Sequence, residues 1–172
     1  LEEIERIEIT THESAIRIIS KEGELNNPAD RDHCIQYMTA IGLLKGDLVA
    51  EDYEDDVAAD PRVDSLRKKM IIKEDKRYSE EYLEADKRSI ANSIQIYFKD
   101  GSFSKNIEVE YPIGHKRRRN EGIPILLSKF KKNLETRFDQ NQVDKIVGFF
   151  SDFDELQKRS VNDFMTLFVT KR

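Results

Sequence analysis

The spacing of apolar and polar residues predicts an alternation of strands and helices along the 172 residues of the chain. Ile7, Ile9 and Thr11 alternate with polar neighbours, which is the pattern of a half-buried strand. A helix is expected from Pro28 to Gly46, because apolar residues cover a wide stripe and a glycine stands at its C-terminal end. A stripe of that width indicates a helix that is buried on more than one side.

The middle of the chain predicts a capped helix followed by a sheet. Asp60 and Pro61 provide the cap and the first-turn proline of that helix. The strands that follow are expected at residues 70–72, 94–98 and 103–111. Asp100 and Gly101 are typical of a hairpin turn, and another helix is expected to start at Pro124. This order predicts an α+β fold, a two-layer sandwich of a mostly antiparallel sheet with helices on one face and a C-terminal helical tail.

Residues 139–172 differ from the rest, because they predict short helices with large apolar faces and no sheet to cover. Ser160 and Asp163 are spaced as a helix cap. The apolar load of this tail is carried by Phe149, Phe150, Phe153, Phe164, Leu167 and Phe168. Leaving several such side chains in water costs several kcal/mol at about 25 cal/mol per Å². If the chain is isolated, we expect the tail to pair with another copy or to stay mobile rather than to dock on the sheet layer.

Composition and charge narrow the classes of protein that fit. The net charge is −5, so binding to nucleic acid would have to rest on one local basic patch. One cysteine allows no internal disulfide, which fits a reducing compartment such as the cytoplasm. No apolar run reaches the length of about 20 residues that a membrane span needs. The chain starts strand-like at Leu1, and we interpret it as a fragment.

One basic segment could hold a small polyanion. His115 is followed by four consecutive cations, residues 116–119, between a strand and a helix, and Gly114 allows a close approach of the backbone. Guanidinium groups match the geometry of carboxylate and phosphate oxygens. A solvated basic loop explains the same pattern, and spacing alone leaves both interpretations open.

A second segment, Asn27 to Gly46, carries other candidates for chemistry. His33 precedes Tyr37 by four residues, so the predicted helix places both on one face. Tyrosines at helical spacing are usually packing residues, and the neighbouring Cys34 has no base spaced to activate it. The histidines have no metal-ligand spacing, and the acidic run at residues 51–56 lacks the pattern of a calcium loop. We therefore expect no metal site.

Taken together, the segments Asn27–Gly46 and Glu110–Pro124 resemble the C-terminal part of 2-methylcitrate dehydratases of the MmgE/PrpD family. The resemblance implies a C-terminal α+β lid domain over residues 1–138. Residues 139–172 would then pack on an N-terminal helical domain that these 172 residues do not contain. It also implies dehydration of 2-methylcitrate to 2-methyl-cis-aconitate in propionate catabolism by the methylcitrate cycle, without a cofactor. Some relatives decarboxylate cis-aconitate or epimerise amino-acid derivatives instead.

The same resemblance implies roles for particular residues. Tyr37 and His115 would be catalytic, with Tyr37 as a proton or hydrogen-bond donor, because an unperturbed phenol is a poor base at neutral pH. The substrate carboxylates would be held by Arg31, His33, Lys116, Arg117 and Arg118. The implied partners are a small tricarboxylate, the N-terminal domain and a second copy in a homodimer, with neither nucleic acid nor membrane. Because the other acid and base groups belong to the N-terminal domain, these 172 residues alone are expected to be inactive.

Two other classes of function stay open from the sequence. The run of cations at residues 116–119 could belong to a nucleic-acid-binding module, although the acidic sequence pI of about 5.4 argues against it. Alternatively, the helical tail could bind a partner in a non-catalytic interaction domain.

Overall fold

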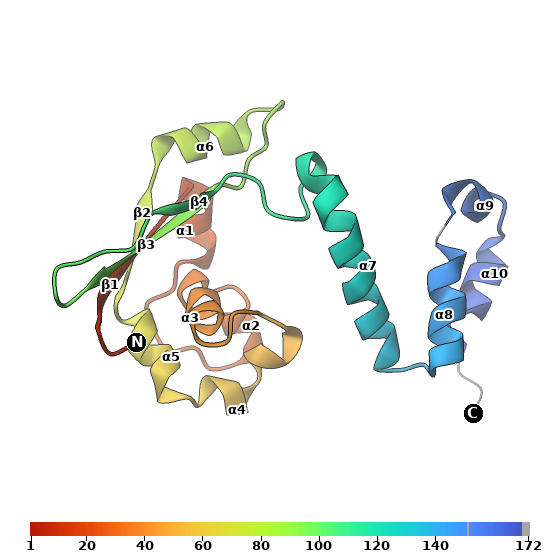
Figure 1. Ribbon diagram of the computed structural model, residues 1–172, viewed down its shortest axis with the longest axis horizontal. Helices are drawn as coiled ribbons and strands as arrows, with labels where there is room; N and C mark the ends of the chain where they lie inside the picture. Colours follow the sequence, from red (N-terminus) through yellow and green to blue (C-terminus); the bar gives the residue numbers. More distant parts are fainter. Residues whose placement is uncertain (151, 170–172) are drawn as a thin grey trace. The chain divides into compact units, whose positions relative to one another are not determined.

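The computed structural model of the chain describes residues 1–150 and 152–169 (Figure 1). The chain divides into two compact units, Leu1–Pro112 and a second unit that begins at Ile113. The first unit contains the sheet, and the described part of the second is helical. The assignment of residues 1–138 and 139–172 to separate domains of a longer protein stays a prediction. Residue 151 and residues 170–172 of that predicted tail lie outside the described part of the chain.

The first unit is built on a four-stranded sheet with the order β2-β1-β3-β4 (Figure 1). The strands are β1 (Ile4–Thr11), β2 (Met70–Glu74), β3 (Asn92–Phe98) and β4 (Ile107–Val109). β1 pairs in parallel with β2 and antiparallel with β3, while β4 runs antiparallel to β3. The predicted α+β class is confirmed, and the sheet is mixed rather than strictly antiparallel. A long crossover connects β1 to β2, as a parallel pair requires.

Helices lie on both faces of the sheet. They are α1 (Glu13–Ile19), α2 (Pro28–Arg31), α3 (Ile35–Lys45), α4 (Asp55–Ala58), α5 (Pro61–Arg67) and α6 (Lys76–Leu83), with a 3₁₀ turn η1 (Ala50–Tyr53). Residues of α3 and α5 pack in one core with Ile4, Ile7 and Ile9 of β1. The opposite face is polar, since Glu8 pairs with Lys73 at 2.9 Å. α6 lies on that face, where its Arg77 donates to Glu108 of β4 at 2.9 Å. The packing of α3 and α5 agrees with the predicted sandwich, and α6 is the exception to helices on one face.

The prediction of one continuous helix from Pro28 to Gly46 is wrong, because the chain breaks between α2 and α3. Cys34 is the N-cap residue of α3 and has extended backbone angles (φ −131°, ψ 107°). His33 therefore lies outside the helix and cannot share a helical face with Tyr37. The C-terminal end agrees with the prediction, since Gly46 ends α3 in the left-handed region at φ 76°.

The second unit begins with the basic segment, which is not the open loop that the sequence suggested. Its elements are η2 (Lys116–Arg118), α7 (Arg119–Glu135), α8 (Gln140–Phe149), α9 (Phe153–Gln157) and α10 (Val161–Thr166). The three residues of η2 form a 3₁₀ turn, and α7 starts directly after it, so Pro124 lies inside this helix rather than at its start. The predicted cap at Ser160 and Asp163 is confirmed.

Part of the apolar surface of the tail is covered within the second unit. Leu134 of α7 is buried together with Val143 and Ile146 of α8. The side chains packed against these three are Phe130, Phe138, Val147, Phe150, Leu167 and Phe168. The expected covers for this surface were an N-terminal helical domain, another copy or none, and α7 was not among them.

Candidate active site

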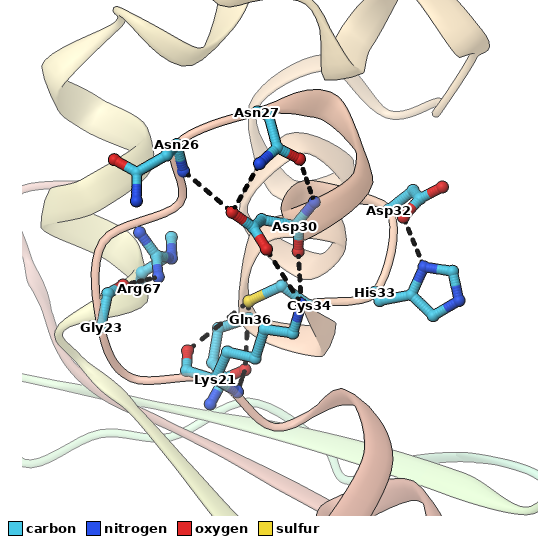
Figure 2. Close-up of polar contacts among 10 residues, drawn as sticks. All are labelled: Lys21, Gly23, Asn26, Asn27, Asp30, Asp32, His33, Cys34, Gln36 and Arg67. Carbon is cyan, nitrogen blue, oxygen red and sulfur yellow. Dashed lines mark hydrogen bonds and ion pairs between the residues drawn. The ribbon is translucent and has the colours of Figure 1, made fainter.

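The segment between α1 and α3 is held in place by Asp30 (Figure 2). The Asp30 carboxylate accepts hydrogen bonds from the Asn26 backbone N–H at 3.2 Å and from the Asn27 side-chain amide at 3.0 Å. In return, the Asn27 Oδ1 accepts the Asp30 backbone N–H and caps α2. The ammonium of Lys21 donates to the backbone carbonyl of Asp30 at 3.3 Å. These bonds fix a polar loop against the start of α2.

Two further side chains tie this loop to the helices around it. Gln36 accepts the Lys21 backbone N–H at its Oε1 and donates from its Nε2 to the Ser20 hydroxyl. From α5, the Nη2 of Arg67 donates to the Gly23 carbonyl at 2.8 Å. Cys34 lies beside Lys21 and Gln36 and is fully buried, which fits the packing role considered for it (Figure 2). The loop between α1 and α2 is therefore held in one conformation by hydrogen bonds to its neighbours.

Arg31, the last residue of α2, is 5% exposed. Its Nη1 donates to the Tyr53 carbonyl at 2.7 Å and pairs with the Asp55 carboxylate at 2.7 Å. Within the described residues, its buried Nε has no hydrogen-bond partner. A charge this deeply buried is costly unless acceptors surround it. Arg31 is therefore well placed to receive a further anionic acceptor.

Tyr37 is 2% exposed and packs in the core of the first unit. Its hydroxyl donates to the backbone carbonyl of Asp52 at 2.6 Å, and its ring stacks near Tyr53. Burial raises the pKa of Tyr37, so the phenol stays protonated at neutral pH. It can act as a donor and not as a base. Donation to a ligand requires the hydroxyl to turn away from Asp52.

A pocket of about 280 Å³ brings some of the predicted residues together. Arg31 and Tyr37 both line it, and so do Asn26 and Arg67. His33 does not line it: its exposed ring pairs with Asp32 and points away from the side of the loop that holds Arg67 (Figure 2). The pocket is lined by two guanidinium groups, an amide and a phenol, and by the carboxylates of Glu24 and Asp64. The two guanidinium groups suit the binding of a carboxylate.

Arg67 is the pocket residue that sequence analysis missed. It forms an i, i+3 ion pair with Asp64 at 2.6 Å, a spacing that indicates an ordinary exposed helix surface. Its side chain is nevertheless only 10% exposed. No local pattern in the sequence distinguishes it from the exposed Arg62 on the same helix.

The remaining predicted residues lie together at the start of the second unit. His115 caps the basic turn, because its Nδ1 accepts the Arg117 backbone N–H at 3.2 Å. Arg118 pairs with Glu121 in the first turn of α7 at 2.8 Å. Lys116 and Arg117 are exposed on the same turn. These cations therefore stand at the positive end of a 17-residue helix, a place where anions are favoured. Whether they meet Tyr37 at one ligand stays a prediction.

The described residues contain neither a metal-binding cluster nor a helix suited to a membrane. No cluster of three or more His, Cys, Asp or Glu side chains in that part of the chain could hold a metal ion. Within the same part, no helix has the length and apolar character needed to cross a membrane.

Comparison with known families identifies the group to which this fold and this pocket belong. Residues 1–152 match the MmgE/PrpD C-terminal domain. The chain belongs to the MmgE/PrpD family. The match covers the whole sheet-containing unit, with the Arg31–Tyr37 pocket, and also the basic turn at residues 116–118. The resemblance seen in the two sequence segments is thereby confirmed.

Several members of the MmgE/PrpD family are similar over nearly the whole chain. The mitochondrial 2-methylcitrate dehydratase of Yarrowia lipolytica is 51% identical over 99% of the chain, which corresponds to 32% of that protein. The 2-methylcitrate dehydratase of Salmonella typhimurium is 50% identical over 97% of the chain and 35% of its own length. A fungal alkylcitrate dehydratase is 36% identical. The chain thus spans about a third of the length of the curated relatives that it matches.

Proposed function

We propose that the chain is the C-terminal part of a 2-methylcitrate dehydratase, a hydro-lyase that forms 2-methyl-cis-aconitate and water. The observation that carries this proposal is the identity of about 50% to relatives of that name over nearly all of the chain. The preformed pocket beside Arg31 and Tyr37 supports it, because a tricarboxylate substrate needs cations for its carboxylates and a donor for its hydroxyl.

In this proposal, residues before and after Pro112 bind the substrate or transfer protons. Arg31 holds a substrate carboxylate, and Tyr37 donates a hydrogen bond or proton towards the departing hydroxyl. His115 is the second proton-transfer group. The remaining carboxylates are bound by His33, Lys116, Arg117 and Arg118. The raised pKa of Tyr37 supports its role as a donor, since deprotonation would remove the proton it has to give.

The base that removes the proton beside a carboxylate would come from residues outside this chain. The isolated chain is therefore expected to bind substrate weakly and not to turn it over. Its partners would be the N-terminal helical domain and a second copy in a homodimer. Its compartment would be the cytoplasm, or the mitochondrial matrix in a eukaryote.

A chimera tests the activity directly. This chain would replace the matching 167-residue segment of the Salmonella typhimurium relative, whose other two-thirds would supply the remaining groups. We expect the chimera to dehydrate 2-methylcitrate, measured by the ultraviolet absorbance of the new carbon–carbon double bond. The intact relative serves as the control. A folded chimera that is inactive on 2-methylcitrate, beside an active parent, would contradict the proposal.

A further inference from the structure

The pocket of about 280 Å³ has an arginine on each of two segments that are far apart in the sequence. Arg31 belongs to α2 and Arg67 to α5, and their side chains are 6% and 10% exposed. Two guanidinium groups buried beside one small polar pocket repel each other and lose hydration. Each has one carboxylate partner within the protein, Asp55 for Arg31 and Asp64 for Arg67, and both partners are themselves exposed.

The hydrogen bonds present in the structure satisfy only part of each guanidinium. Arg67 donates from Nη1 to the Asp64 carboxylate and from Nη2 to the Gly23 carbonyl. Arg31 uses its Nη1 for both of its acceptors. Within the described residues, the Nε of each arginine is buried and lacks a hydrogen-bond partner. A buried N–H without an acceptor is destabilising. An additional acceptor near either guanidinium group would therefore be favourable.

We propose that Arg67 and Arg31 together bind one carboxylate of the substrate. One carboxylate has four lone-pair positions and can accept from two guanidinium groups at once. The acidic pocket residues, Glu24 and Asp64, are exposed, and Asp64 is already paired with Arg67. Asp30 and Gln36 hold the loop between α1 and α2, which lies next to Arg67. Binding of a carboxylate therefore costs little conformational entropy in this loop. This inference rests on the proposed function and adds Arg67 to it.

The binding test uses the 172-residue chain itself with tricarballylate, a tricarboxylate that lacks a hydroxyl. Nuclear magnetic resonance follows the Nε–H signals of Arg31 and Arg67 during the titration. We expect saturable shifts of both signals, and a dissociation constant at least about tenfold weaker in Arg67→Met. Arg62→Met is the matched control, because Arg62 lies on the same helix, is exposed and pairs with Asp60. Its affinity should stay within about twofold of the unmodified chain.

Arg67→Lys separates binding from folding, and it also carries the test if Arg67→Met does not fold. A lysine keeps the charge but lacks the planar fork, so affinity should fall while the urea midpoint stays close to that of the unmodified chain. Unchanged affinity in Arg67→Lys would overturn the inference. Equal shifts with inorganic phosphate would overturn the assignment to a carboxylate.

The chimera distinguishes failure of this inference from failure of the proposed function. Arg67→Lys in the chimera should raise KM about tenfold with kcat within about twofold, as expected for a group that binds substrate and transition state alike. An active chimera with unchanged KM would refute the role of Arg67 and leave the function standing. An inactive chimera would refute the function, and the shifts in the isolated chain would still report on the pocket.

Discussion

Replacing Tyr37 with phenylalanine separates the structural role of its hydroxyl from a catalytic one. The substitution keeps the ring in the core and removes one oxygen. That oxygen donates to the Asp52 carbonyl at 2.6 Å in a side chain that is 2% exposed. In the chimera, the same oxygen is proposed to face the substrate hydroxyl. A single substitution therefore has two predicted effects of different kinds.

The structural effect follows from the buried hydrogen bond. A net hydrogen bond contributes about 0.5–1.5 kcal/mol, and a buried carbonyl left without its donor costs about 1–3 kcal/mol. We expect Tyr37→Phe to lower the free energy of unfolding of the chain by about 1–3 kcal/mol in urea titrations. The catalytic effect is separate, because loss of a proton donor should lower the kcat of the chimera by about 100-fold with little change in KM.

Tyr97→Phe is the matched control. The Tyr97 hydroxyl donates only to the Gln95 side chain, at 3.0 Å, on the half-exposed polar face of the sheet. Its loss should change stability by no more than about 0.5 kcal/mol and should leave kcat unchanged. A kcat within about twofold for folded Tyr37→Phe would show that the hydroxyl serves only the core, and the catalytic assignment would be refuted.

Two further predictions concern His12 and the glycines of the second unit. Burial lowers the pKa of His12, whose Nδ1 accepts the Ala15 N–H, so the unfolded chain takes up a proton first as pH falls below 6.5. The free energy of unfolding should therefore decrease from pH 7 towards pH 5, and His12→Asn should flatten this slope in urea titrations; an equal slope would contradict the burial argument. A Cβ at residue 122 would overlap the Ile113 carbonyl oxygen. Gly122→Ala should therefore lower the free energy of unfolding of the second unit by about 1–3 kcal/mol. Gly148→Ala has open space and should stabilise α8 by up to about 1 kcal/mol, and equal effects of the two changes in circular dichroism would refute the overlap.

The features that sequence analysis predicted well are those set by neighbouring residues. Asp60 caps α5 by accepting the Arg62 N–H, and Gly46 ends α3 in the left-handed region. The alternation in β1 and β3 also matched the structure, because one face of each strand meets the core. For the two helix ends the physical cause lies within a few residues of the pattern.

The features that it missed depend on contacts between distant segments. The break before α3 has no glycine or proline to announce it, and Cys34 is held by contacts with Lys21 and Gln36. Arg67 lines the pocket because α5 packs beside α3. Its i, i+3 ion pair with Asp64 is typical of an exposed helix surface and gave no sign of this position. α7 starts at Arg119, directly after the turn that His115 caps, and not at Pro124. Gly122, which lies against the Ile113 carbonyl oxygen, was not singled out from the sequence.

The position of β1 in the sheet has a consequence for biosynthesis. Ile7 of β1 faces Met70 in β2 and Ile96 in β3, so the central strand precedes both of its partners in the order of translation. Ribosomes add about 5–20 residues per second, and the interval between β1 and the end of β3 therefore lasts about 5–20 s. β2 is complete before β3, so β1 can pair on one side while its other side stays open. Pairings of such high contact order form late, and the β3 side of β1 is therefore expected to stay unpaired until Phe98 has been synthesised.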